Sequence, residues 1–218
     1  MSGGHGLLSG ALPPMNWPNL ITLSRVPALF VVVALVFAGT PGMATAAFVV
    51  FVLAGVSDWL DGYLARRYRI VSNFGKLMDA LTDKVLVVGL MIAMLVPMPG
   101  ARDSLLPDWA VFLVLLIFSR EFLVTGLRLV AASLGRVLAA ERTGKIKTVL
   151  QLVSVSVLLL AHALEADFQH PHAAHEAQVI GLWLFVAAAG LTAISGVGYL
   201  VKYWDMFMGR TDGSTGQP

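Results

Sequence analysis

The sequence predicts an all-α integral membrane protein whose helices cross the bilayer six times. The chain has 218 residues, of which 57% are hydrophobic and 13% are charged, and its mean hydropathy is +0.79. Soluble domains are nearer a quarter charged. Six apolar stretches approach the length of about 20 residues that a spanning helix needs. The chain has no cysteine, which excludes a disulfide framework and a thiolate metal site.

The predicted helices follow one another with short connections. They cover roughly residues 20–38, 43–67, 74 or 75 to 96, 107–133, 143–164 and 177–203. A G-T-P-G turn at 39–42 separates the first two, Pro97 and Pro99 end the third, and Gly135 is a plausible stop for the fourth. We expect one membrane domain over residues 16–207. The tails 1–15 and 208–218 are polar or rich in Gly and Pro, so we expect them to be disordered, and the first lacks the basic region of a signal peptide.

The distribution of Lys and Arg predicts the orientation of the chain. With six crossings, both termini share one side with the connections after the second and fourth helices. That side holds ten basic residues, whereas the opposite connections hold Arg102 alone. Because basic residues favour the cytoplasmic side, both termini should be cytoplasmic. The ten are Arg66, Arg67, Arg69, Lys76, Arg136, Arg142, Lys145, Lys147, Lys202 and Arg210.

Four carboxylates at helical spacing occupy the second and third predicted helices. Asp58 and Asp61 are three residues apart, and Asp79 and Asp83 are four apart, so each pair shares a helix face. Charge at membrane depth is costly and marks a candidate functional site. Carboxylates are the ligands that Mg²⁺ or Mn²⁺ prefers, and two such ions would suit phosphoryl transfer. The sequence therefore predicts a divalent-metal site beside the basic connection at 66–76.

Small and basic residues accompany the carboxylates. Gly62 and Ala65 follow Asp58 on the same face and would let a ligand approach the helix backbone, while Arg66 could pair with a phosphate. Gly75 has the same small-residue role before Asp79. Taken singly, such glycines are usually packing contacts.

The whole run from Asp58 to Asp83 reads D-x2-D-G-x2-A-R-x8-G-x3-D-x3-D. It resembles the signature of the CDP-alcohol phosphotransferase family, with no departure. The resemblance implies a six-helix membrane enzyme, commonly a homodimer, that transfers a substituted phosphate from a CDP-linked donor to an alcohol and releases CMP. It also implies that Asp58, Asp61, Asp79 and Asp83 hold two divalent cations and that Asp83 is the general base. Gly62, Ala65, Arg66 and Gly75 would shape the CDP-donor site.

Three flanking stretches indicate the acceptor. P-N-L-I-T-L-S-R-V at 18–26, S-R-E-F-L-V-T-G-L-R-L-V-A-A at 119–132 and G-K-I-K-T-V-L-Q at 144–151 resemble bacterial members that take CDP-diacylglycerol and sn-glycerol 3-phosphate. A phosphorylated acceptor requires Arg and Lys. The candidates for its phosphate are Arg120, Thr125, Arg128, Arg142, Lys145 and Lys147.

These candidates have simpler explanations. Glu121 could neutralise Arg120 inside the bundle, and Arg142, Lys145 and Lys147 could reflect orientation or anionic-lipid contact alone. The four histidines 162, 170, 172 and 175 are expected on the non-cytoplasmic side, where a solvated loop is more plausible than a metal site.

Several functions remain open at this point. Within the family the acceptor could be inositol phosphate, phosphatidylglycerol, serine or an amino alcohol. From other classes, the chain could be a divalent-cation transporter or a non-catalytic scaffold, but ligands gathered beside a basic loop favour phosphoryl chemistry. We expect a bacterial inner membrane, an active site facing the cytoplasm, and no nucleic-acid partner.

Overall fold

The computed structural model describes residues 17–68, 73–133 and 142–202, and residues 1–16, 69–72, 134–141 and 203–218 lie outside the description. Both predicted tails therefore lie outside the described residues. Within these ranges the all-helical prediction is confirmed, with six helices and no strand. The helices are α1 (Trp17–Phe37), α2 (Met43–Tyr68), α3 (Asn73–Ala93), α4 (Ala110–Ser133), α5 (Arg142–Ala166) and α6 (Pro171–Lys202).

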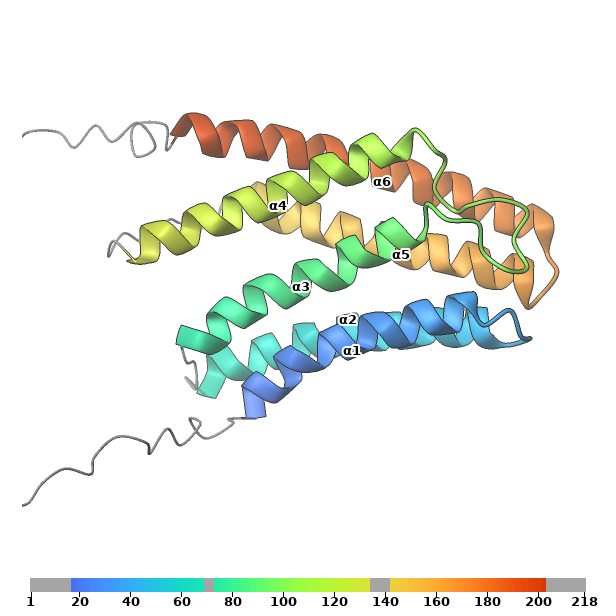
Figure 1. The fold of residues 1–218 in the computed structure, drawn as a ribbon, viewed down its shortest axis with the longest axis horizontal. Helices are drawn as coiled ribbons and strands as arrows, with labels where there is room; N and C mark the ends of the chain where they lie inside the picture. The colour runs from blue at the N-terminus through green and yellow to red at the C-terminus, as the bar shows by residue number, and fades with distance from the viewer. Residues whose placement is uncertain (1–16, 69–72, 134–141, 203–218) are drawn as a thin grey trace, which may run out of the picture.

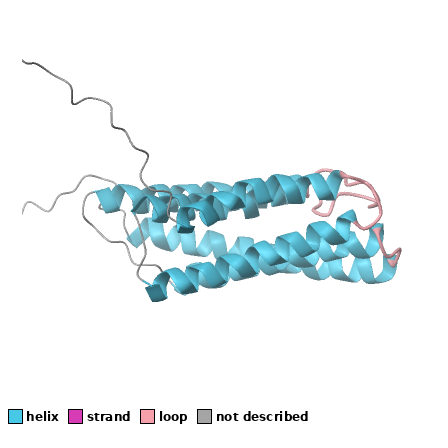
Figure 2. Ribbon diagram, turned by 90° about the horizontal axis from the view of Figure 1, so that it is seen from below, coloured by secondary structure: helices cyan, strands magenta, loops and turns pink. Residues whose placement is uncertain are grey.

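The helices run side by side and alternate in direction, so they form an elongated bundle (Figure 1). The α5–α6 pair shares the most extensive contact. Helix α1 packs on α2 and α3, α2 packs on α5, and α4 packs on α3 and α6. The three described connections, at 38–42, 94–109 and 167–170, gather at one end (Figure 2), which we call the loop end. At the opposite end α1, α3 and α5 begin and α2, α4 and α6 end.

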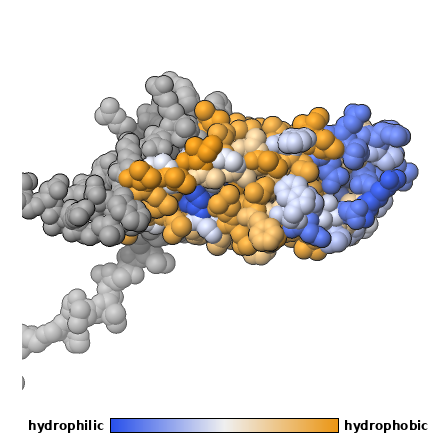
Figure 3. Space-filling model, turned by 90° about the horizontal axis from the view of Figure 1, so that it is seen from above, coloured by the Kyte–Doolittle hydropathy of each residue, from blue (hydrophilic) through white to orange (hydrophobic). Residues whose placement is uncertain are grey.

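The middle of the bundle is apolar outside as well as inside. Large hydrophobic side chains such as Phe112, Trp183 and Ile194 are exposed, and the face seen in Figure 3 is mostly apolar up to the hydrophilic loop end. Stretches Ala110–Ala132, Ile146–Ala166 and Pro171–Val201 are long and apolar enough to cross a membrane. The apolar parts of α1, α2 and α3 are shorter over the residues searched. The chain is therefore a membrane protein with at least three helices of spanning length and composition.

Helix boundaries differ from the predicted ones mainly at the loop end. Helix α6 begins at Pro171 rather than near residue 177, since proline suits the first helical position and the Ala174 N–H donates to the His170 carbonyl at 3.0 Å. Helix α3 ends at Ala93, and a tighter turn follows before Pro97. A proline disfavours the helical conformation for the residue that precedes it.

Asp167 ties the loop end together by capping a helix 125 residues away in the sequence. Its Oδ1 accepts the Gly42 N–H at 2.8 Å, and its Oδ2 accepts the Thr45 N–H at 2.7 Å and the Thr45 hydroxyl at 2.6 Å. The first N–H groups of a helix lack partners within it, and a carboxylate there also complements the helix dipole. The α5–α6 connection therefore anchors the start of α2.

These hydrogen bonds set the ionisation of Asp167, which lies outside the apolar stretches of α5 and α6. Partial burial acts to raise the pKa of Asp167, but the hydrogen bonds from Thr45 and Gly42 outweigh it and hold the pKa below its usual value. The stabilisation is therefore present above the unfolded-state pKa near 4 and is lost as the pH falls through the folded-state value.

We predict that Asp167→Asn lowers the free energy of unfolding by about 1–2 kcal/mol near pH 7, because an amide keeps one acceptor oxygen and no charge. Thermal unfolding in detergent measures this loss. The difference from wild type should shrink below about pH 4, where the wild-type carboxyl also becomes protonated. Asp103→Asn, at an exposed position of the same end, is the matched control and should change little. Equal melting temperatures for the two variants would contradict the capping role.

Candidate active site

Two continuous helices carry the Asp motif. Asp58 and Asp61 lie in α2 together with Gly62, Ala65 and Arg66, and Gly75, Asp79 and Asp83 lie in α3. The helical spacings assumed for both pairs therefore hold in the backbone. The side chains of these eight residues lie outside the described residues, so their roles stay predictions.

The two Asp pairs stand at matching heights above the connection between α2 and α3. Asp61 precedes the end of α2 at Tyr68 by seven residues, and Asp79 follows the start of α3 at Asn73 by six, so both lie about 10 Å along their helices. Asp58 and Asp83 each lie ten residues, about 15 Å, from the same ends. The two Asp pairs thus lie at similar distances from the ends of their helices.

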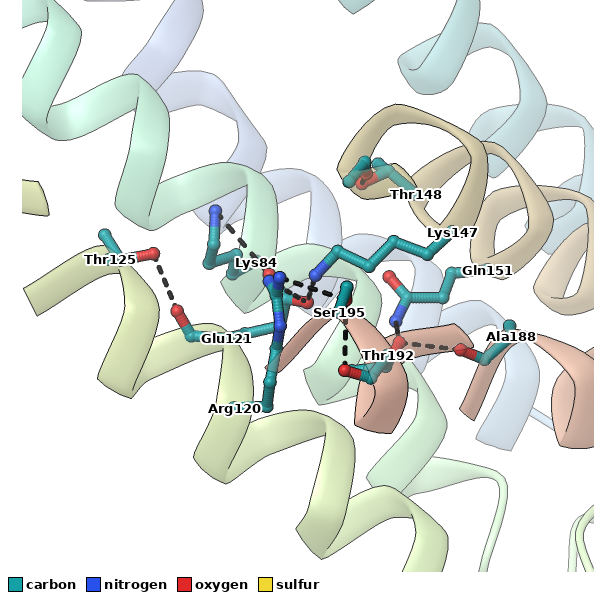
Figure 4. Close-up of polar contacts among 11 residues, drawn as sticks. Lys84, Arg120, Glu121, Thr125, Lys147, Thr148, Gln151, Ala188, Thr192 and Ser195 are labelled. Carbon is teal, nitrogen blue, oxygen red and sulfur yellow. Dashed lines mark hydrogen bonds and ion pairs between the residues drawn. The ribbon is translucent and has the colours of Figure 1, made fainter. Parts of the chain in front are cut away.

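A buried polar cluster surrounds the carboxylate of Glu121 in α4 (Figure 4). Glu121 Oε1 accepts a hydrogen bond from Lys147 Nζ of α5 and lies 3.4 Å from Arg120 Nη1. Its Oε2 lies 3.9 Å from Lys84 Nζ of α3. Glu121 and Lys147 are both almost fully buried, so their charges are compensated within the bundle rather than by water.

The cluster continues into α6 through neutral side chains (Figure 4). Arg120 Nη2 donates to Ser195 Oγ at 3.1 Å, and Ser195 Oγ donates to the Thr192 carbonyl at 3.1 Å. Gln151 Nε2 of α5 donates to Thr192 Oγ1 at 3.3 Å, and that hydroxyl donates to the Ala188 carbonyl at 2.6 Å. Side chains from α3, α4, α5 and α6 thus meet in one network.

Lys84 relates this network to the Asp motif. It directly follows Asp83 in α3, so their Cα atoms are about 3.8 Å apart. Because Lys84 Nζ approaches Glu121, the helix that carries the second Asp pair also contributes a member of the basic cluster. Residues that the sequence assigned to metal and to acceptor therefore belong to neighbouring parts of one bundle.

The predicted acceptor residues have different surroundings. Arg120 and Lys147 meet at Glu121, as the simpler explanation of Arg120 also required. Thr125 Oγ1 donates to the Glu121 carbonyl within its own helix at 2.7 Å, and the Arg128 guanidinium lies 5.6 Å from the Tyr199 ring centroid. Arg142 and Lys145 lie in the first turn of α5, with side chains outside the described residues. The structure thus brings Arg120 and Lys147 together, gives Thr125 a partner in its own helix and places Arg128 near an aromatic ring of α6.

Sequence reasoning missed several members of the network. The missed residues are polar side chains within apolar helices, and this pattern could have identified them as candidates. They are Lys84, Gln151, Thr192 and Ser195.

The histidines do not form one group. His162 is buried in α5 and lines a cavity of about 90 Å³ near Gly39 and Asp167, whereas His172 and His175 are exposed on the first turns of α6. Among the described residues, no three His, Asp or Glu side chains are arranged to hold a metal ion.

We predict that Glu121→Gln destabilises the protein by about 3–5 kcal/mol, because three basic side chains lose their shared carboxylate in a buried site. Lys147→Met should cost less, about 1–3 kcal/mol, since Glu121 keeps Arg120 and Lys84. The double variant should lose less than the sum of the two. Unfolding in detergent would measure all three.

The exposed pair Arg102–Glu165, 3.8 Å apart at the loop end, supplies the control. Arg102→Gln should change stability by about 0.5 kcal/mol or less, because solvent screens the pair. Additive effects of Glu121→Gln and Lys147→Met would show that the buried pair is not coupled.

The sequence is similar to known proteins over most of its length. The sequence model of the CDP-alcohol phosphatidyltransferase family matches residues 15–194. A Bacillus subtilis (strain 168) protein is 37% identical over 202 residues, which cover 87% of this chain and 96% of that protein. A Rickettsia bellii (strain RML369-C) protein is 37% identical over 145 residues, 66% of this chain and 75% of that protein. Both are named CDP-diacylglycerol–glycerol-3-phosphate 3-phosphatidyltransferase.

A third relative carries a different name. A rice (Oryza sativa subsp. japonica) protein named cardiolipin synthase (CMP-forming) is 32% identical over 206 residues, which cover 90% of this chain and 60% of that protein. The family match and the Bacillus relative both extend over most of the chain, and the family match includes the whole Asp motif together with Lys84, Arg120, Glu121 and Lys147. The chain therefore belongs to the CDP-alcohol phosphatidyltransferase family.

Proposed function

We propose that this enzyme transfers the phosphatidyl group of CDP-diacylglycerol to sn-glycerol 3-phosphate and yields phosphatidylglycerophosphate and CMP. The names of the Bacillus and Rickettsia relatives support this acceptor. The observation that carries the proposal is the approach of Lys84, the neighbour of Asp83, to the carboxylate that gathers Arg120 and Lys147. It relates the helix of the predicted general base to the basic side chains that a phosphorylated acceptor needs.

Members of the family generally use divalent metals. Two Mg²⁺ or Mn²⁺ ions would be held by Asp58, Asp61, Asp79 and Asp83. The donor set fits hard cations, because it consists of carboxylates at matching heights on two helices. When bound, the ions supply positive charge that stabilises the diphosphate and the departing phosphate of CMP.

The chain's own residues have separate tasks in this reaction. Asp83 takes the proton of the acceptor's 1-hydroxyl, whose oxygen then attacks the phosphorus that bears diacylglycerol. Gly62, Ala65 and Gly75 leave room for the CDP group, and Arg66 pairs with its phosphate. Arg120 is the main residue that binds the acceptor's phosphate, and Lys147 lies beside it. The further members of this phosphate-binding group are Thr125, Arg128, Arg142 and Lys145.

The same proposal includes the membrane topology. All six helices of a single domain, residues 16–207, cross a bacterial inner membrane, and both termini and the Asp motif face the cytoplasm. The low basic content of the loop end supports this orientation, because Arg102 is the only Lys or Arg in its three described connections. CDP-diacylglycerol enters from the cytoplasmic leaflet, and the enzyme works as a homodimer.

The test is CMP release by purified protein with CDP-diacylglycerol, Mg²⁺ or Mn²⁺, and one candidate acceptor at a time. We expect release with sn-glycerol 3-phosphate and its loss after exhaustive chelation. Asp83→Asn should lower kcat by a factor of about 10² or more, because the base is removed, whereas Asp103→Asn at the loop end should keep it. Full activity of Asp83→Asn, or of chelated enzyme, would refute the corresponding assignment.

The rice relative supports a second candidate acceptor, phosphatidylglycerol, which would make the product cardiolipin. Release of CMP with phosphatidylglycerol and not with sn-glycerol 3-phosphate would establish that alternative. Inositol phosphate and serine serve as the remaining arms of the same assay. Divalent-cation flux into liposomes without CMP release would instead indicate a transporter.

A further inference from the structure

We infer that Ser195 and Gly196 of α6 are positioning residues that hold the Arg120 guanidinium in place for a phosphorylated acceptor. The inference rests on the proposed function, because it concerns the affinity of that same site for its acceptor. It assigns a role to α6, where the sequence singled out no functional residue.

Gly196 provides the surface against which Arg120 lies. A Cβ atom placed at Gly196 would lie 2.8 Å from Arg120 Cγ and 3.7 Å from its Nε. The closer of these atoms is near the root of the side chain, so Arg120 could avoid the contact only by changing its first torsion angles. Glycine at 196 therefore permits the path that the Arg120 side chain takes.

Ser195 fixes the far end of the same side chain. Its Oγ accepts the Arg120 Nη2–H at 3.1 Å while donating to the Thr192 carbonyl at 3.1 Å, which leaves its lone pairs directed at the guanidinium. Thr192 is itself fixed, because its hydroxyl contacts Gln151 of α5 and the Ala188 carbonyl. The hydroxyl that holds Arg120 thus belongs to a rigid, buried part of the bundle.

Three restraints act together on Arg120. Gly196 sets the course of its stem, Ser195 holds Nη2, and Glu121 Oε1 lies 3.4 Å from Nη1. A guanidinium is a planar fork whose value in phosphate recognition depends on its orientation. Holding it before the acceptor arrives reduces the entropy lost on binding. Disturbing the α6 restraints should therefore raise the KM for the phosphorylated acceptor selectively.

Gly196→Ala and Gly198→Ala form a matched pair of variants. Both replace a glycine in the same helix and share any gain in helix propensity, but a Cβ at Gly198 meets no atom within 4 Å. We expect Gly196→Ala to raise the KM for sn-glycerol 3-phosphate by about 10- to 100-fold. Its KM for CDP-diacylglycerol should equal that of Gly198→Ala.

Ser195→Ala tests the second restraint without adding an atom, so it keeps the inference testable if Gly196→Ala fails to fold. Its control is Ser156→Ala, since Ser156 Oγ donates only to the Leu152 carbonyl of its own helix among the contacts described for it. We expect Ser195→Ala to raise the KM for sn-glycerol 3-phosphate by about three- to tenfold and Ser156→Ala to leave it unchanged. The inhibition constant of inorganic phosphate as a competitor should rise by the same factor.

A purely structural role would change kcat and both KM values together. That result, or equal kinetics for Gly196→Ala and Gly198→Ala, would overturn the positioning role while leaving the proposed reaction intact. Wild-type protein that releases no CMP with sn-glycerol 3-phosphate would refute the proposed acceptor itself, and with it the role given to Arg120.

Discussion

The carboxylate of Glu121 is the contact on which the interior of the bundle depends. It is the only acidic side chain among the buried residues that the structure describes, and basic groups from α3, α4 and α5 surround it. In an apolar bundle an isolated charge would be far more costly than in water, so these four groups constrain one another. The register of three helices is thereby tied to one side chain.

This constraint also explains how a membrane protein can hold a charged site at all. The lipid-facing surface is apolar, and the polar side chains lie between helices, where hydrogen bonds and ion pairs satisfy them. At the loop end Asp167 performs a comparable task outside the apolar region by joining the start of α2 to the α5–α6 connection. One end of the bundle is therefore fixed by a capped helix, and its interior by an ion-pair network.

Much of the fold and part of the site followed from the sequence because they depend on local pattern. Apolar runs, prolines and glycines located six helices to within a few residues, apart from the start of α6. The prediction that Asp58 and Asp61, and Asp79 and Asp83, share helix faces needed only helical periodicity. The resemblance of the whole motif to a known signature indicated the family that the comparisons confirm. Ser195 and Thr192 could not be found in this way, because their importance depends on which helix faces Arg120.

Arg120 and Lys147 also differ in a way that depends on the tertiary structure and not on the local sequence pattern. From sequence both were basic candidates for one phosphate, with different simpler explanations. In the bundle Lys147 bonds the Glu121 carboxylate directly, while Arg120 reaches past Glu121 to α6 with its second terminal nitrogen. An ammonium acts as a point charge, whereas a guanidinium can contact two partners in fixed directions. Lys147 is therefore suited to neutralising Glu121, and Arg120 to orienting a planar fork. Under the proposed function, specificity for a phosphorylated acceptor would depend first on how α6 holds Arg120.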